Sequence, residues 1–312
     1  MANLAVVAIG GNSLIKSPER QSVPDQWEAM AETCAHIAAM IARGWDVVVT
    51  HGNGPQVGFI LLRSELASHV LHTVPLDVCG ADTQGAIGYM AQVGLDAAMA
   101  RLRVARRTAT VVTRVVVDRD DPAFKKPTKP IGPFYTQEQA DRYRGERGWI
   151  VVEDAGRGWR RVVPSPQPLE IIETEAIRAL LAAGFVVVGV GGGGIPVIRQ
   201  DGDMRGVEAV IDKDHASSLL ARTIRADLLL ISTAVERVAL NYKKADERPV
   251  ARMTLAEARR HLAEGQFPPG SMGPKIEAAI AYLQAGGKEV LITSPENIER
   301  ALAGETGTRI VA

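Results

Sequence analysis

Lysines set in short restrained motifs are the residues of this sequence best suited to chemistry. Of the 36 basic residues in the 312-residue chain, 27 are Arg and nine are Lys, so a lysine inside a motif is a departure from the usual surface cation. Lys129 stands in the string PTKPIG, Lys213 stands between Asp212 and Asp214, and Lys275 follows Pro274 where a helix is expected to begin. An ammonium is a compact point charge that can contact a moving phosphoryl oxygen. The three lysines together, with Asp214 as a charge partner, fit phosphoryl transfer, in which a protein mainly positions groups and neutralises charge.

Three glycine-rich turns follow apolar runs that are typical of buried strands. They are Gly10-Gly11-Asn12, Gly52-Asn53-Gly54 and Gly191 to Gly194. Ligands collect at the carboxyl ends of strands in open α/β sheets, where helix N-termini donate N–H groups to anions. The turns therefore predict a phosphate or carboxylate site in one crevice. The alternative for Gly191 to Gly194 is a glycine-rich hairpin loop followed by a solvated charge cluster.

Other site chemistries find less support. The sequence has no Walker A string, and the glycines after Gly52 and Gly54 do not have dinucleotide-fingerprint spacing. His69, His72 and Cys79 match no standard zinc spacing. His51 is open to two interpretations, a general base beside the glycine turn or a strand-end histidine bonded to backbone.

Composition narrows the class of protein. Hydrophobic residues make up 46% and charged residues 23%, and the 36 basic residues are balanced by 36 acidic ones. We therefore expect no nucleic-acid or membrane partner. Only two cysteines are present, without CxxC spacing, and no run has signal-peptide character or membrane-spanning length. These features predict a soluble, cytoplasmic protein.

The elements that must position the lysines and glycines alternate between strand and helix. We expect strands at 3–9, 46–50, 186–190, 226–232, 289–293 and 308–311, and a β-rich segment at 108–117. Helices are expected after a capping box of Asp25 and Glu28, after the string 51–58 as far as Ala67, and at 81–103, 171–183, 215–225, 254–264 and 273–285. The alternation predicts an α/β fold with an open, mostly parallel sheet covered on both faces. Residues 118–168, rich in Pro, Gly and charge, are expected to form a small protruding subdomain with a hairpin of 149–152 and 159–163.

Eight strings in this order resemble the carbamate kinase family of the amino acid kinase superfamily: AIGGN (8–12), THGNGPQVG (50–58), QGAIGY (84–89), PTKPIG (127–132), GGGGIPV (191–197), VIDKD (210–214), TAVERV (233–238) and GSMGPK (270–275). The resemblance covers nearly the whole chain. It implies a homodimeric three-layer αβα sandwich, the amino acid kinase fold. An N-terminal lobe, residues 1–225, would bind carbamate or carbamoyl phosphate, with residues 118–168 as a lid. A C-terminal lobe, residues 226–312, would bind ATP or ADP with magnesium.

The resemblance also implies roles for individual residues. N–H and amide donors around carbamate and the moving phosphoryl group would come from Gly10, Gly11, Asn12, Gly52, Asn53 and Gly54. Lys129 and Lys213 would neutralise that group and Lys275 the nucleotide phosphates, with Asp214 orienting the lysines. The nucleotide would contact Thr233, Val235, Tyr242, Met272, Gly273 and Lys275. Magnesium would be held mainly by phosphate oxygens, with Asp212 facing it through water.

Departures from the pattern sharpen this expectation. Wider relatives carry a lysine where this chain has Ala8, so the lid residue Lys129 would supply the missing cation. The string GADTQG, with Asp82, and the segment 241–246 also depart from the usual family pattern. The expected reaction is reversible transfer between ATP and carbamate, which needs no general base because carbamate is already an anion. The alternatives are another small-acid kinase of the superfamily and a non-catalytic protein that senses a nucleotide or metabolite.

Overall fold

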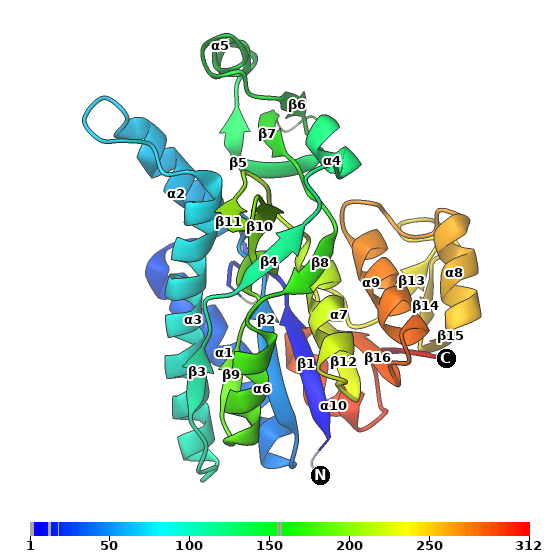
Figure 1. The fold of residues 1–312 in the computed structure, drawn as a ribbon. Helices are drawn as coiled ribbons and strands as arrows, with labels where there is room; N and C mark the ends of the chain where they lie inside the picture. The colour runs from blue at the N-terminus through cyan, green and yellow to red at the C-terminus, as the bar shows by residue number, and fades with distance from the viewer. Residues whose placement is uncertain (1–2, 12–13, 18, 155, 157) are drawn as a thin grey trace.

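A central eight-stranded sheet organises the computed structural model, which describes residues 3–11, 14–17, 19–154, 156 and 158–312 (Figure 1). The strand order is β15-β17-β16-β12-β1-β2-β9-β3. The bounds are β1 Leu4–Ile9, β2 Asp46–His51, β3 Thr108–Thr110, β9 Val186–Val188, β12 Leu228–Ser232, β15 Arg252–Thr254, β16 Glu289–Thr293 and β17 Thr308–Val311. All neighbours are parallel except β16 and β17. The predicted mostly parallel α/β sheet is confirmed.

Helices cover both faces of this sheet, which makes three layers. Alternate residues of β1 point to opposite faces, so Ala5 and Val7 belong to one buried cluster and Val6 and Ala8 to the other. One face packs against α1 Val23–Ala42, α3 Leu76–Arg101 and α10 Ile298–Leu302. The other packs against α6 Thr174–Ala182, α7 Lys213–Thr223, α8 Leu255–Ala263 and α9 Met272–Gln284. None of the helices in the described part of the chain is both long and apolar enough to cross a membrane.

Smaller sheets lie beyond the carboxyl ends of β1 and β2 and beside the C-terminal strands (Figure 1). The second sheet has the order β11-β10-β4-β8, with β4 Arg114–Val117, β8 Pro168–Ile171, β10 Ile195–Gln200 and β11 Asp203–Gly206. The expected β-rich segment 108–117 is therefore divided between two sheets. A separate pair consists of β13 Val238–Leu240 and β14 Arg248–Val250. Short 3-10 turns occur at η2 Gly191–Gly193 and η3 Pro295–Asn297.

The lid, residues 118–168, protrudes over the carboxyl ends of the central strands (Figure 1). Its predicted hairpin is present as β6 Val151–Glu153 and β7 Trp159–Val163. Three elements of the lid were not predicted: the third strand, β5 Lys129–Tyr135, and the helices α4 Pro122–Lys125 and α5 Gln137–Arg147. Aromatic rings flanked by arginines hold this small unit together: the Tyr143 and Trp149 ring centroids are 4.7 Å apart, and the Arg161 guanidinium carbon is 4.6 Å from the Trp149 ring centroid.

Local helix boundaries differ from prediction where side chains, rather than periodicity, set them. The capping box of α1 is Ser22 with Asp25, not Asp25 with Glu28, because Pro24 fits the first helical turn and the Ser22 hydroxyl accepts from the Asp25 N–H. The helix expected at 81–103 already begins at Leu76. The helix expected from residue 171 begins at Thr174, because Ile171 pairs with Val115 in the second sheet.

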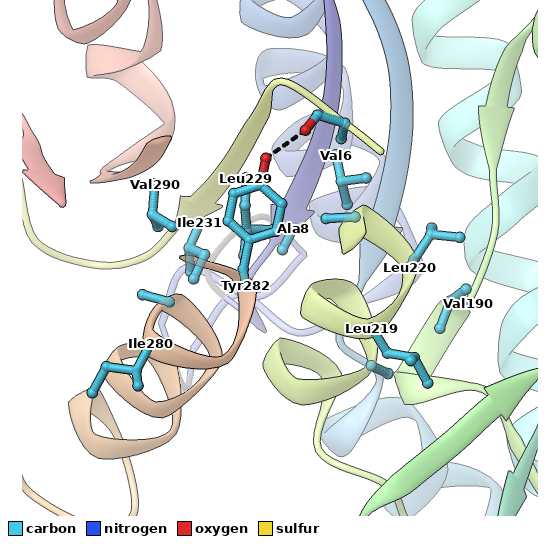
Figure 2. Packing of buried hydrophobic residues seen from close by; sticks show 14 of the residues in the cluster. Val6, Ala8, Val190, Leu219, Leu220, Leu229, Ile231, Ile280, Tyr282 and Val290 are labelled. Atoms are coloured by element: carbon cyan, nitrogen blue, oxygen red, sulfur yellow. Dashed lines mark hydrogen bonds between the residues drawn. The ribbon is translucent and has the colours of Figure 1, made fainter. Parts of the chain in front are cut away.

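A buried tyrosine joins α9 to the connection before β12 (Figure 2). The Tyr282 side chain is fully buried, and its hydroxyl donates to the carbonyl oxygen of Ala226 at 2.5 Å. Gly287 lies against the ring, where a Cβ would come 2.4 Å from a ring carbon. The ring therefore fixes the position of the helix that begins with the Lys275 segment.

We predict that Tyr282→Phe lowers the free energy of unfolding by about 1–2 kcal/mol, because the buried carbonyl of Ala226 loses a hydrogen-bond donor. Urea unfolding measures this change. The control is Tyr242→Phe, whose side chain is 45% exposed and for which we expect a change below about 0.5 kcal/mol. Equal stability of all three proteins would contradict this role for Tyr282.

Candidate active site

One cavity of about 270 Å³ lies where the glycine turns after β1, β2 and β9 meet the lid. Gly11, Gly52 and Gly192 represent the three turns in its lining, and Lys129, Lys213 and Lys275 add three ammonium groups. The helix α2, Gly54–Leu66, begins at this cavity. The predicted convergence of the turns and the lysines on one crevice is present in the structure.

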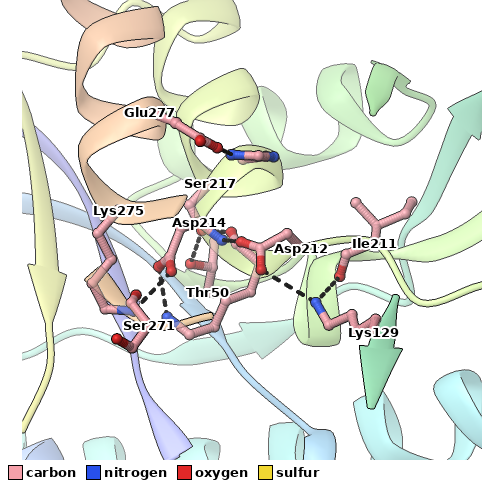
Figure 3. A network of polar contacts seen from close by, with 11 residues as sticks. Thr50, Lys129, Ile211, Asp212, Asp214, Ser217, Ser271, Lys275 and Glu277 are labelled. Atoms are coloured by element: carbon pink, nitrogen blue, oxygen red, sulfur yellow. Dashed lines mark hydrogen bonds and ion pairs between the residues drawn. The ribbon is translucent and has the colours of Figure 1, made fainter. Parts of the chain in front are cut away.

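Asp214 forms ion pairs with two of these lysines (Figure 3). Its Oδ1 lies 2.7 Å from Lys213 Nζ and its Oδ2 lies 3.0 Å from Lys275 Nζ. The carboxylate is 3% exposed, and the lysine side chains are 14% and 13% exposed. Because Lys213 and Asp214 begin α7 while Lys275 lies in the first turns of α9, a single buried carboxylate ties two helix N-termini together.

The charges in this cluster shift one another's protonation. Burial raises the pKa of Asp214, but the ammonium groups of Lys213 and Lys275 outweigh burial and hold the pKa below its usual value. Burial lowers the pKa of Lys213, repulsion from Lys275 adds to this, and Asp214 opposes it. Two ammonium groups share one carboxylate, so the cluster carries a net positive charge that an incoming anion would offset.

Asp212 connects the lid to the same cluster (Figure 3). Its Oδ2 lies 3.2 Å from Lys129 Nζ, and its Oδ1 accepts the backbone N–H of Asp214 at 2.9 Å as the N-cap of α7. Lys129 Nζ also donates to the carbonyl oxygen of Ile211 at 3.2 Å. Burial opposes ionisation of Asp212, but the positive charges of Lys129, His215 and Lys213 hold its pKa well below the usual range.

The four consecutive glycines are required by protein packing. All are buried, and Gly192 alone among them lines the cavity. A Cβ would come 2.3 Å from the His51 ring at Gly191, 2.1 Å from the Asn53 amide at Gly192 and 2.5 Å from the Ile211 carbonyl oxygen at Gly193. Backbone and side chains of the protein therefore approach these glycines closely, and Gly192 brings the loop to the predicted crevice. The alternative of a solvated hairpin loop is wrong, because all four glycines are buried.

Gln84, which was not predicted as a site residue, supports this loop. Its Nε2 donates to the carbonyl oxygens of Gly191 and Thr113, at 3.0 and 3.1 Å, and its Oε1 accepts the Thr113 N–H at 2.8 Å. All three hydrogen bonds of this buried amide are to backbone. A glutamine on the long helix α3 therefore positions a loop that lies more than a hundred residues further along the chain.

The remaining glycines and asparagines expected at the site have different positions. Gly11, Gly52, Asn53 and Gly54 line the cavity. Gly10 does not, and a Cβ there would lie 3.0 Å from the Ser232 carbonyl oxygen, so this glycine allows β1 and β12 to end close together. Asn12 lies outside the described residues. The Asn53 side chain donates one of its two Nδ2 hydrogens to Thr83 Oγ1 at 2.9 Å.

A second, larger cavity of about 600 Å³ adjoins the first through Ser271 and Lys275, which line both. Thr233, Val235, Tyr242 and Met272 line it as expected. Gly273 does not, because it packs against the Pro268 carbonyl oxygen, 3.1 Å from an added Cβ. Sequence reasoning missed several lining residues, including Glu236, Arg237, Ala239, Pro249, Arg300 and Glu305.

His51 is a strand-end histidine bonded to backbone. Its ring is 1% exposed and its Nδ1–H donates to the Gly52 carbonyl oxygen at 3.0 Å. Burial lowers its pKa to about 4, which keeps the ring neutral. No group of three His, Cys, Asp or Glu side chains placed to hold a metal ion occurs within the described residues, and Cys79 is buried while His69 and His72 are exposed.

Known proteins resemble this chain over its full length. Residues 3–294 match the model of the amino acid kinase family. The chain is 51% identical to the carbamate kinase-like protein YahI of Escherichia coli, covering 100% of this chain and 99% of that protein, and 46% identical to a carbamate kinase of Thermococcus kodakarensis, covering 98% of each. Among solved structures, a carbamate kinase from Giardia lamblia bound to AMP-PNP superposes with a TM-score of 0.93 at 44% identity, over 99% of this chain and 98% of that one.

We predict that His51 makes stability fall with acidification. The folded pKa, about 4, lies below the unfolded value of about 6.5, so the unfolded state alone takes up a proton as the pH falls below 6.5. Between pH 7 and pH 5 this linkage removes about 2 kcal/mol of unfolding free energy.

Urea unfolding at both pH values compares the wild type with His51→Gln, which should lose about 2 kcal/mol less over this range. The exposed residue His72 provides the matched variant His72→Gln, whose pH dependence should equal that of the wild type. An unchanged pH dependence in His51→Gln would show that His51 is not the group responsible.

Proposed function

We propose, from the premise that this chain belongs to the amino acid kinase family, that it is a carbamate kinase, an ATP-dependent phosphotransferase with a carboxylate-type acceptor. The proposed reaction is ATP + carbamate = ADP + carbamoyl phosphate, in either direction. The observation that carries it is the group of three lysines, two on Asp214 and one on Asp212, at a small cavity joined to a nucleotide-sized one.

The chemistry needs charge neutralisation more than proton transfer. A carboxylate oxygen of carbamate attacks the terminal phosphorus of ATP, one P–O bond forms, and the bond to the ADP oxygen breaks. The reactants are both anions, so the site has to overcome their repulsion. We assign Lys213 and Lys129 to the transferred phosphoryl group, and Lys275 to the nucleotide phosphates because it lines both cavities.

The N-terminus of α2 adds backbone donors. Asn53 is the N-cap of this helix, yet its side chain makes no capping bond, so it takes up none of the first-turn N–H groups. These groups lie at the cavity with Gly54 and favour negative charge. We assign them, together with the backbone of Gly11 and Gly52, to the acceptor and the phosphoryl group.

Magnesium would enter with the nucleotide. The carboxylates nearest the cavity are already engaged: Asp214 binds two ammonium groups, and each oxygen of Asp212 has a protein partner. This donor set fits an ion that is held by nucleotide phosphates, where it would neutralise part of their charge. A water-mediated contact of Asp212 to that ion stays a prediction.

The lid contributes its cation through close packing on α2. A Cβ on Gly58 of α2 would come 2.9 Å from the Cα of Gly132 in β5, so the two backbones touch. The apolar side chains of Val57, Ile131 and Val163 join the same contact in a small separate cluster. We propose that this packing sets the position from which Lys129 reaches the phosphoryl group.

The assembly, lobes and location extend the proposal. We propose a homodimer in which the exposed apolar side chains Val78, Tyr89 and Val93 of α3 meet a second copy, because exposed apolar side chains gathered on one helix favour association. We also propose that residues 1–225 form the lobe that binds the acceptor and residues 226–312 the lobe that binds the nucleotide.

A cytoplasmic location is supported by two free, buried cysteines, Cys34 and Cys79.

The direct test is formation of ATP from carbamoyl phosphate and ADP, followed with a coupled assay. Rapid ATP formation supports the carbamate kinase assignment. Turnover only with another acyl phosphate would indicate a different acid kinase of the same fold. Tight ADP binding without any turnover would indicate a nucleotide sensor.

We predict that Lys213→Ala lowers kcat by about 10²–10³-fold, because one preorganised donor to the transferred group is worth roughly 3–4 kcal/mol. The matched control is Lys288→Ala, whose side chain is 73% exposed in an ion pair remote from the cavity. The control should keep wild-type kcat. Near-normal kcat in Lys213→Ala would remove this lysine from the transfer step.

We also predict that Lys129→Arg lowers kcat at least about tenfold, although the charge is kept, because a planar guanidinium cannot take the position of a compact ammonium. Lys126→Arg makes the same exchange at an exposed lid residue and should leave kcat unchanged. Full activity of Lys129→Arg would mean that the lid supplies charge without a specific geometry.

A further inference from the structure

We propose that Asn53 recognises the amino group of the acceptor through its side-chain oxygen Oδ1, and that Thr83 is the positioning residue that turns this oxygen toward the cavity. The inference rests on the proposed function, because it assigns one end of the proposed acceptor. It refines the expectation that the Asn53 amide contacts the acceptor, because one Nδ2 hydrogen is donated to Thr83 and Oδ1 is assigned a role of its own.

Asn53 occupies the N-cap position of α2, but its side chain does not cap the helix. It is the N-cap residue of α2, a position where an asparagine oxygen commonly accepts a first-turn N–H. Here the side chain makes no such bond. The residue is 6% exposed and lines the 270 Å³ cavity beside Gly52 and Gly54. A nearly buried amide that gives up its capping bond has an orientation set by other contacts.

Thr83 on α3 sets that orientation. The Thr83 hydroxyl donates its one hydrogen to the Gly80 carbonyl oxygen at 2.7 Å, which leaves Oγ1 as an acceptor. Asn53 Nδ2 donates to this acceptor at 2.9 Å. If the amide were turned over, two acceptors would face each other unless the Thr83 hydroxyl abandoned Gly80. The hydroxyl therefore defines which end of the amide faces α3.

Gly192 packs closely against the same amide. An added Cβ at Gly192 would come 2.1 Å from Asn53 Nδ2 and 2.9 Å from Oδ1, so the amide lies directly against the bare backbone of this glycine. Among the described residues no group donates to Oδ1 of Asn53. The arrangement presents the Oδ1 oxygen as one fixed, unused hydrogen-bond acceptor at the 270 Å³ cavity.

A fixed hydrogen-bond acceptor such as Oδ1 favours a ligand group that can donate a hydrogen bond. Oδ1 would repel the carboxylate and phosphoryl oxygens, which suit Lys129, Lys213 and the first-turn N–H groups of α2 instead. Carbamate carries hydrogen-bond donors only on its amino group, so this group is the part of the molecule that Oδ1 attracts. Acetate has nearly the same shape but offers a methyl group there, which would leave Oδ1 desolvated and unpaired. The site thereby distinguishes a carbamoyl from an acetyl group of the same size.

The experiment compares carbamoyl phosphate with acetyl phosphate. Dissociation constants for both compounds are measured by calorimetry with the full-length protein, together with kcat/KM for ATP formation from ADP. We expect the wild type to prefer carbamoyl phosphate, and Asn53→Ala to reduce the ratio of the two affinities by roughly tenfold, the effect of one hydrogen bond with a buried partner. Acetyl phosphate should bind Asn53→Ala no more weakly than carbamoyl phosphate does.

The Thr83 variants separate positioning from folding. Thr83→Val keeps the shape but removes the acceptor for Nδ2, so we expect the affinity ratio to fall several-fold with little change in kcat for the carbamoyl phosphate that still binds. Thr83→Ser keeps the hydroxyl and should restore the wild-type ratio. An equal loss of affinity for both compounds in Asn53→Ala, or an unchanged ratio in Thr83→Val, would overturn the proposal. Absence of wild-type turnover would instead refute the proposed function, because the affinity ratios are measured without turnover.

Discussion

The buried carboxylate of Asp214 is the interaction on which the rest of the site depends. Two lysines from different helices share it, at 2.7 and 3.0 Å, with almost no solvent to screen them. Removing the charge of Asp214 would leave two ammonium groups buried side by side, which is far more costly than the pair itself is stabilising. The arrangement remains one positive charge in excess. That excess is the physical basis for bringing together two anionic reactants.

Several glycines allow the backbone to pass close to this charged cluster. A Cβ on Gly52 would lie 3.1 Å from the Lys213 side chain, and one on Gly193 would lie 2.5 Å from the Ile211 carbonyl oxygen. Ile211 and Asp212, in turn, hold Lys129 of the lid. The fixed lysine Lys213, the lid lysine Lys129 and the loop of Gly191 to Gly194 are thus connected through a few backbone atoms. Two polar side chains of α3 hold the glycine turns in position: Thr83 accepts a hydrogen bond from Asn53, and Gln84 donates one to the Gly191 carbonyl oxygen.

Much of this could be predicted from sequence because the signals were local. Apolar runs followed by glycine turns gave the central strands, and the strict order of motifs gave the amino acid kinase fold and the group of lysines. The lid was less predictable. Its third strand holds Pro130 and Pro133 and pairs irregularly, so its pattern does not resemble a strand, and its helix α5 has only Ala140 buried.

The sequence by itself determined the alternation of strands and helices and the residue types of the site, because hydrophobic periodicity and motif spacing are properties of neighbouring residues. Only the tertiary structure decided how those residues are used. It showed that the glycine loop is packed against His51 and Ile211, that His51 is bonded to backbone, and that Gly10 and Gly273 face protein instead of a cavity. It also showed that Asn53 donates one of its two amide hydrogens to Thr83. These outcomes depend on which distant segments meet, and contacts between residues 30 to more than 100 positions apart leave no periodic trace in one sequence.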